Sequence, residues 1–261
     1  MLRARIIPCL LVHKKGLVKT VRFGSPKYVG DPINAVKIFN EKEVDELIVL
    51  DIDATVNGAE PDYTMIGNLA AECRMPLCYG GGVKTVEQAV RIIKMGVEKV
   101  ALSSAAVENP QVVADIARFV GNQSVVVVLD AKRDRHGRYS VWTRNGTVDT
   151  GQEPVALATR LSQLGAGEVT INSIDNDGEM KGYDLDVARQ VRAAVTVPMT
   201  VLGGAGSLRD IDALIREFGI IGAAAGSLFV FKGIYKAVLI NYLSHASKAA
   251  MLAGPPAGVR T

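Results

Sequence analysis

Five consecutive apolar residues, Val125 to Leu129, place the strongest constraint on the fold of this chain. An uninterrupted run of mostly β-branched residues is typical of a strand that is buried on both faces. Such strands occur in parallel sheets that helices cover on both sides. The run ends in Asp130, with Lys132 and Arg133 close behind. A carboxylate at the carboxyl end of a parallel strand can act as a general acid or base, although Asp in this position is also a common helix cap.

The size and charge of the chain narrow the class of protein. It has 261 residues, 48% of them hydrophobic and 22% charged, which suits one large core or two small domains. A net charge of +3 suits an anionic small ligand. We expect no nucleic-acid partner, because the sequence has no basic run interleaved with aromatic residues. We expect no membrane partner either, since no apolar run approaches the roughly 20 residues that span a bilayer.

The cysteines and histidines predict neither disulfides nor a metal site. Cys9, Cys73 and Cys78 are odd in number and lack metal-ligand spacing, and the three histidines are scattered along the chain. The first residues lead directly into an expected strand, without the pattern of a secretory signal peptide. The sequence therefore predicts a cytoplasmic protein with no metal and no cofactor.

Strand and helix patterns alternate along almost the whole chain. Strands are expected at 5–12, 46–51, 76–79, 98–103, 125–130, 168–173, 198–202 and 220–225. Helices are expected at 31–41, 61–73, 85–95, 109–120, 153–164, 184–194, 208–218 and 232–243, with a basic loop at 13–19 and a small hairpin around 139–143. This alternation predicts an α/β fold, a single (β/α)8 TIM barrel over residues 1–250, followed by a disordered tail at 251–261. A doubly wound sheet is the alternative.

The two halves of the chain resemble each other. Residues 76–106 and 198–228 both read as a strand, a glycine cluster, a helix, a second strand and a turn of small residues. A two-fold half-barrel repeat explains this similarity better than a doubly wound sheet does.

The repeat predicts two equivalent anion sites, because glycines allow backbone N–H groups to approach a phosphate. Either glycine cluster alone could serve only to reverse the chain, but the same pairing occurs twice. The residues expected at these sites are Gly81, Gly82, Ser103 and Ser104 in the first half and Gly204, Gly206, Gly226 and Ser227 in the second. We therefore expect a ligand with two phosphates, or a nucleotide-like ligand with phosphates at both ends.

Short motifs throughout residues 1–245 resemble the cyclase subunit of imidazole glycerol phosphate synthase, the HisF-like family. They include Ile6–Leu10, Gly30–Pro32, Asp45–Leu47, Leu50–Ile52, Gly80–Gly82, Ala105–Pro110, Asp130–Arg133, Gly165–Glu168, Ser173–Asp175, Asp177–Gly178 and Gly203–Gly206. The resemblance implies a barrel that receives ammonia from a separate glutaminase subunit (HisH-like) at its amino-terminal face. It implies that the ammonia reacts with a bisphosphate substrate at the other face, where Asp177 and Gly178 join the phosphate-binding set.

The resemblance also assigns catalytic roles. The family uses two aspartates, at the ends of the first and fifth strands, and Asp130 matches the second of them. The position of the first is occupied by Leu11, which cannot transfer a proton. Lys19 matches the lysine of the family's flexible loop.

Four charged residues match the family's ammonia gate at the floor of the barrel. They are Arg5, Glu46, Lys99 and Glu168, at the amino ends of four strands. Two positive and two negative side chains there are expected to form a closed ring of ion pairs. The alternative is a set of solvated charges that only stabilises the bottom of the barrel.

An intact gate beside Leu11 resembles one branch of the family, the glycosyl-amidation-associated (WbuZ-like) proteins of surface-polysaccharide gene clusters. That resemblance implies ammonia delivery to a sugar amidotransferase that converts an acetamido sugar. Two alternatives remain: an authentic cyclase of histidine biosynthesis, and a scaffold subunit that activates the glutaminase without carrying ammonia.

Overall fold

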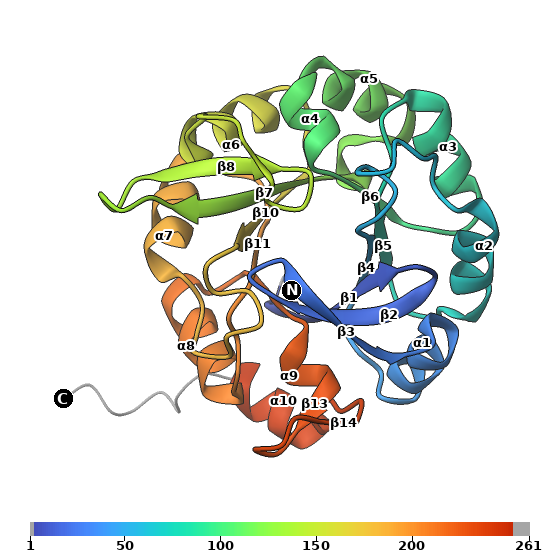
Figure 1. Ribbon diagram of the computed structural model, residues 1–261, viewed down its shortest axis with the longest axis vertical. Helices are drawn as coiled ribbons and strands as arrows, with labels where there is room; N and C mark the ends of the chain where they lie inside the picture. The colour runs from blue at the N-terminus through green and yellow to red at the C-terminus, as the bar shows by residue number, and fades with distance from the viewer. Residues whose placement is uncertain (1–2, 253–261) are drawn as a thin grey trace.

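Each of the eight expected strands forms and belongs to one closed parallel barrel (Figure 1). The structure, a computed structural model, describes residues 3–252. Around the barrel the strands follow the order β10, β11, β12, β1, β4, β5, β6, β7, and β7 pairs with β10 to close it. Their bounds are Arg5–His13 (β1), Leu47–Asp51 (β4), Leu77–Gly80 (β5), Lys99–Leu102 (β6), Val125–Arg133 (β7), Glu168–Ser173 (β10), Met199–Leu202 (β11) and Gly222–Ala225 (β12). The predicted TIM barrel is confirmed.

The valine run shows why the fold needs two cores. Val125, Val127 and Leu129 of β7 pack in the larger cluster, between the strands and the surrounding helices. Val126 and Val128 point the other way, into a smaller cluster inside the barrel. Because side chains alternate along a strand, an apolar run is stable only where both faces are buried.

Helices surround the barrel in Figure 1 and connect successive strands. The connecting helices are Pro32–Glu41 (α1), Tyr63–Glu72 (α2), Val86–Lys94 (α3), Gln111–Val120 (α5), Pro154–Gln163 (α6), Leu185–Ala194 (α7) and Leu208–Phe218 (α8). Shorter segments are Ser104–Glu108 (α4), Asn122–Ser124 (η1) and Ser227–Val230 (α9). The sequence β5–α3–β6–α4 recurs as β11–α8–β12–α9, as the half-barrel repeat predicts.

Two antiparallel additions extend the barrel strands at their carboxyl ends. The hairpin β2–β3 (Gly16–Val21 and Gly24–Gly30) continues from β1, so the basic loop expected at 13–19 is wrong beyond residue 15. The turn that joins β1 to β2 consists of Lys14 and Lys15 alone. The hairpin expected around 139–143 is present as β8–β9 (Tyr139–Thr143 and Val148–Asp149).

The helix expected at 232–243 does not form, and that prediction is wrong. Gly233 and Lys236 have positive φ angles of 72° and 48°, which a right-handed helix cannot contain. They close a turn between β13 (Phe231–Lys232) and β14 (Ala237–Val238). The backbone N–H of Leu239 then donates to Val230 O at 2.8 Å, which holds the segment against α9.

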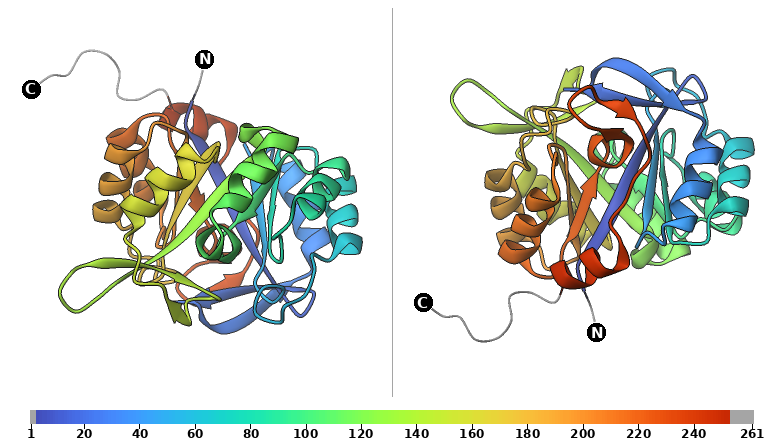
Figure 2. Two further views of the ribbon diagram at one scale, coloured as in Figure 1. Left: turned by 90° about the horizontal axis from the view of Figure 1, so that it is seen from above. Right: turned by 90° about the horizontal axis from the view of Figure 1, so that it is seen from below.

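The last described helix, α10 (His245–Leu252), lies at the end of the barrel where β1 begins, opposite the two hairpins (Figure 2). Lys248 Nζ lies 2.6 Å from Asp45 Oδ1, just before β4. The expected tail at 251–261 begins inside this helix, and its residues 253–261 lie outside the described part of the chain. Between residues 3 and 252, no helix is long and apolar enough to cross a membrane.

Candidate functional site

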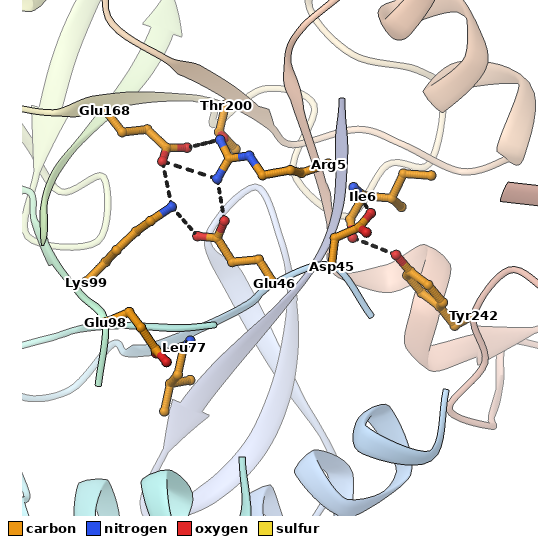
Figure 3. Close-up of polar contacts among 10 residues, drawn as sticks. All are labelled: Arg5, Ile6, Asp45, Glu46, Leu77, Glu98, Lys99, Glu168, Thr200 and Tyr242. Atoms are coloured by element: carbon orange, nitrogen blue, oxygen red, sulfur yellow. Dashed lines mark hydrogen bonds and ion pairs between the residues drawn. The ribbon is translucent and has the colours of Figure 1, made fainter. Parts of the chain in front are cut away.

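The four charged residues expected at the barrel floor do form a closed ring (Figure 3). Glu46 accepts from Arg5 Nη1 and, at 2.8 Å, from Lys99 Nζ. Glu168 Oε1 lies 2.7 Å from Arg5 Nη2, and Glu168 Oε2 lies 2.9 Å from Lys99 Nζ. Positive and negative groups therefore alternate around the ring. The hydroxyl of Thr200, which sequence reasoning missed, donates to Glu168 Oε1 at 2.5 Å.

Burial and charge act in opposite directions on this ring. Burial alone would raise the pKa of Glu168, but Arg5, Lys99 and the hydroxyl of Thr200 outweigh it and lower the pKa to about 2. Burial alone would lower the pKa of Lys99, but Glu168 and Glu46 outweigh it and raise that pKa. The pKa of Arg5 is raised in the same way. Glu168, Lys99 and Arg5 therefore stay ionised at neutral pH.

The interior of the barrel between the ring and the opposite end, here called the bore, is apolar. It is filled by a buried cluster of side chains from several strands: Ile7, Cys9, Ile48, Cys78, Ala101, Val126, Val128, Leu202 and Ala224, with the partly buried Leu11 and Leu50 packed against them. Uncharged, small residues suit the passage of a neutral molecule better than that of an ion, because desolvating a charge is expensive.

Beyond the bore, at the carboxyl ends of the strands, lies a large cavity with an empty volume of about 1250 Å³ that includes its open mouth. Most of the residues predicted at the site line this cavity: Leu11, Lys19, Gly81, Gly82, Ser103, Ser104, Asp130, Asp177, Gly178, Gly204, Gly226 and Ser227. Residues that the sequence did not single out also line it, among them Asp51, Arg144 and Asn172.

Asp130 lies at the carboxyl end of β7 with two hydrogen-bond donors. Asn172 Nδ2 donates to Oδ1 at 2.9 Å, and Ser103 Oγ donates to Oδ2 at 3.2 Å. Burial raises the pKa of Asp130 to about 6, although both donors act to lower it. A carboxyl group with a pKa near neutrality can both take up and release a proton under physiological conditions.

Leu11 contributes an apolar side chain to the cavity wall, as the sequence requires. On the neighbouring strand, Asp51 lines the same cavity, and the sequence signal for it was the same as for Asp130, an acid at a strand end. Burial raises the pKa of Asp51, while the backbone N–H groups of Asp53 and Ala54, 2.9 and 3.2 Å from Oδ1, lower it.

Lys19 belongs to strand β2 and is buried, whereas the resemblance placed it on a flexible loop. Its Nζ donates to the backbone oxygen of Cys9 at 2.5 Å, at the top of the bore. Burial lowers the pKa of Lys19, while Cys9 and Asp177 act to raise it. The amine is therefore positioned to meet a ligand at the inner end of the cavity.

The first predicted anion site is only partly free for a ligand. Gly81 and Gly82 have φ angles of 121° and 74°, and a Cβ on Gly81 would lie 2.4 Å from Asp51 O. The side chains beside them are already engaged, since Ser103 faces Asp130 and Ser104 Oγ accepts from the backbone N–H of Arg144 at 3.2 Å. The backbone N–H of Gly82 is engaged as well, since it donates to Thr55 Oγ1 at 3.4 Å.

The second site departs further from the prediction. Gly204, Gly226 and Ser227 line the cavity, but Gly206 does not. The N–H of Gly206 donates to Asp210 Oδ2 at 2.9 Å, inside the capping box that begins α8. Sequence spacing could not reveal that this N–H was already used.

Asp177 and Gly178 connect the cavity wall to the β2–β3 hairpin. Asp177 Oδ2 accepts from Thr20 Oγ1 at 2.7 Å and from the N–H of Phe23 at 3.3 Å. A Cβ on Gly178 would lie 2.1 Å from Thr20 O, so only glycine fits there. Through residues 3–252 no cluster of three or more His, Cys, Asp or Glu side chains could hold a metal ion.

The raised pKa of Asp130 predicts that Asp130→Asn stabilises the protein. The folded pKa, about 6, exceeds the unfolded value of about 3.9, so the unfolded chain ionises first as the pH rises. Folding stability is therefore lost between about pH 4 and pH 6, and a neutral amide avoids that loss. We expect a gain of up to about 3 kcal/mol in the free energy of unfolding at pH 8, because the two pKa values differ by about 2 units at roughly 1.4 kcal/mol each. Urea denaturation at pH 8 and pH 4 measures it; a gain of the same size at pH 4 would contradict this explanation.

Comparison with known proteins identifies one family over most of the chain. Residues 5–236 match the family model described as "Histidine biosynthesis protein". The chain is 59% identical over 249 residues to a Vibrio vulnificus protein provisionally named imidazole glycerol phosphate synthase subunit hisF3, covering 95% of this chain and 96% of the relative.

Two further relatives extend the comparison. A Leptospira interrogans protein provisionally named imidazole glycerol phosphate synthase subunit HisF is 57% identical over 252 residues, covering 96% of this chain and 99% of the relative. The imidazole glycerol phosphate synthase subunit HisF of Alkaliphilus metalliredigens is 41% identical over 234 residues, covering 90% of this chain and 93% of the relative. Nearly the full length of the chain therefore matches proteins of one kind.

Proposed function

Because the chain belongs to the histidine biosynthesis protein family, as a homologue of HisF-type subunits of imidazole glycerol phosphate synthase, we propose that it carries ammonia through its barrel. A glutaminase subunit on the amino-terminal face would supply the ammonia, and an acceptor with two phosphates would meet it in the cavity. The observation that carries the proposal is the placement of the charged ring at one end of the apolar bore and of the cavity at the other.

Each part of this series has a chemical role in the proposal. The closed ring excludes water and ammonium, because a closed set of ion pairs leaves no free charge to attract them. The bore accepts neutral ammonia, which has only a small desolvation penalty compared with an ion. At the cavity, Asp130 handles protons near neutral pH, and the glycine backbones at Gly81 and Gly204 hold phosphates.

The names of the relatives favour ring closure as the reaction, in which ammonia and phosphoribulosyl-formimino-AICAR-phosphate give imidazole glycerol phosphate and release AICAR-phosphate. Residue Asp130 would be its proton-transfer group and Lys19 its ligand-binding amine. The assay supplies that substrate with ammonium salt, without a glutaminase, and measures imidazole glycerol phosphate. Turnover that disappears in Asp130→Asn supports this reaction.

Amidation of a nucleotide-linked acetamido sugar is the second candidate, and Leu11 favours it. With one proton-transfer carboxylate replaced by an apolar side chain, the cavity is poorly equipped for ring closure. In this reaction the ammonia passes on to a sugar amidotransferase. The test reconstitutes glutaminase, amidotransferase and this protein with the sugar; amidation that proceeds equally well without this protein excludes the role.

Obstructing the bore separates ammonia transport from a scaffold role. Ala224→Met places a long side chain inside the bore, whereas Ala223→Met on the same strand faces the helices. Both alanines are fully buried, so both variants overpack the protein to a similar degree. We expect only Ala224→Met to lower glutamine-dependent product, by about tenfold or more, because the neutral path is closed.

The control for this prediction is the reaction with external ammonium salt, which should change little in either variant. Glutamine hydrolysis by the partner should also persist, so that hydrolysis and product formation become uncoupled. Equal glutamine-dependent activity in Ala224→Met and Ala223→Met would favour the scaffold alternative.

A further inference from the structure

Thr200 is an uncharged residue built into the charged ring. It is fully buried on β11, and its hydroxyl donates to Glu168 Oε1 at 2.5 Å, while Arg5 Nη2 lies 3.5 Å away (Figure 3). Glu168 is thereby held by Arg5, Lys99 and Thr200 together. Among residues 3–252, the other carboxylate of the ring, Glu46, has only Arg5 and Lys99 as side-chain hydrogen-bond partners.

The neighbouring strand leaves room for this hydroxyl. Gly222 of β12 lies between Arg5 and Thr200 in the sheet register. A Cβ on Gly222 would lie 1.9 Å from Thr200 Oγ1, closer than any real contact. The φ angle of Gly222 is not positive, so the backbone conformation does not require glycine at this position. Glycine is required because the side chain of Thr200 occupies the space that a Cβ would need.

We propose that Thr200 is a positioning residue of the barrel floor, whose hydroxyl fixes Glu168 and keeps the ring closed between deliveries of ammonia. The inference rests on the proposed entry of ammonia at the floor. With the hydroxyl in place, Glu168 Oε1 is shared between Thr200 and Arg5, so the carboxylate cannot follow a departing cation. Without the hydroxyl, the carboxylate is free to rotate towards one cation and away from the other, and the floor opens.

The reactivity of the three cysteines can detect opening of the floor, because one lies in the bore, one at the cavity and one outside the barrel. Cys78 lies in the bore beside the ring; its Cα pairs with that of Lys99, and Glu46, Lys99 and Glu168 all act on its thiol. Cys9 lines the cavity, where Lys19 and Asp130 act on it. Cys73 is partly exposed at the end of α2, outside the barrel.

The experiment measures the labelling of each cysteine by methyl methanethiosulfonate, a small uncharged reagent, with peptide mapping by mass spectrometry. Losing a hydrogen bond to a charged group should populate the open floor about tenfold or more, and labelling of Cys78 in Thr200→Val should rise accordingly. Cys9 and Cys73 should label at the rates of the unaltered protein. Thr200→Ser keeps the hydroxyl and should restore slow labelling of Cys78.

A second variant, Gly222→Ala, tests the same contact without changing Thr200 itself. Gly222→Ala displaces the hydroxyl of Thr200 without removing it, so it should also accelerate labelling of Cys78.

Three outcomes overturn the inference: unchanged labelling of Cys78 in Thr200→Val, equally fast labelling in Thr200→Ser, or a parallel rise at Cys9. The assay needs neither glutaminase nor substrate. A floor that opens in Thr200→Val while the obstructed bore of Ala224→Met leaves product formation intact would keep the positioning of Glu168 by Thr200 and reject ammonia transport.

Discussion

Replacing Leu11 by aspartate is expected to raise ring-closing turnover with ammonium salt by about 10²–10⁴-fold, the usual contribution of a positioned general acid or base. Leu11 and Asp130 line the same cavity, and Asp130 already has a pKa of about 6. A second carboxylate at position 11 gives the cavity a proton donor and a proton acceptor in different surroundings. Such pairs divide acid and base roles between them. The measurement is imidazole glycerol phosphate formed from the phosphoribulosyl-formimino substrate.

Leu11→Asn is the matched control, since it adds a polar side chain of the same size that cannot exchange a proton. Both variants place a polar group where a half-buried leucine packs against the bore, so their unfolding free energies should fall by similar amounts. Turnover in Leu11→Asp no higher than in Leu11→Asn would show that a missing acid at this position does not limit ring closure. Asp51, on the adjacent strand in the same cavity, would then be the next carboxylate to replace.

Sequence patterns were sufficient for the barrel because its strands and helices follow strong, regular signals. The run from Val125 to Leu129 required burial on both faces, and the structure divides it between two cores. The segment 232–243 failed because its turn depends on positive φ at Gly233 and Lys236, and local apolar content does not reveal that. Pairing with β13 decides its structure, which is a tertiary effect.

The position of a site residue was predictable where an acid directly follows a strand pattern, as with Asp130, which lines the cavity. It was not predictable where the role depends on a neighbour. Thr200 has no motif, and its importance follows from the position of Glu168 on the adjacent strand. Gly206 matched the expected pattern, yet its N–H is used by Asp210. Hydrogen-bond partners of this kind are fixed only when the chain has folded.

Glu168→Gln should lower the free energy of unfolding by about 3 kcal/mol at neutral pH, because removing one partner of a buried ion pair leaves the other charges uncompensated. Arg5 and Lys99 would then face a single carboxylate, Glu46, and the new amide would direct a donor at one of the two cations. The glutamine keeps the shape of the side chain, so the loss reports charge more than packing. Urea denaturation at pH 7 measures it.

The dependence of the unfolding free energy on acidic pH tests whether the charge of Glu168 causes this loss. The folded pKa of Glu168, about 2, lies below its unfolded value of about 4.5, so its contribution is complete above pH 4.5 and is lost as the pH falls towards 2. The curves of Glu168→Gln and the unaltered protein should therefore converge over that window. Glu98→Gln is the control. Glu98 lies on the same face of the barrel and accepts a hydrogen bond from the backbone N–H of Leu77 at 2.7 Å. Because an amide oxygen can accept the same bond, the free energy of unfolding should change by less than about 0.5 kcal/mol. A constant difference between Glu168→Gln and the unaltered protein from pH 7 to pH 2 would mean that packing, not the ring of charges, holds the floor closed.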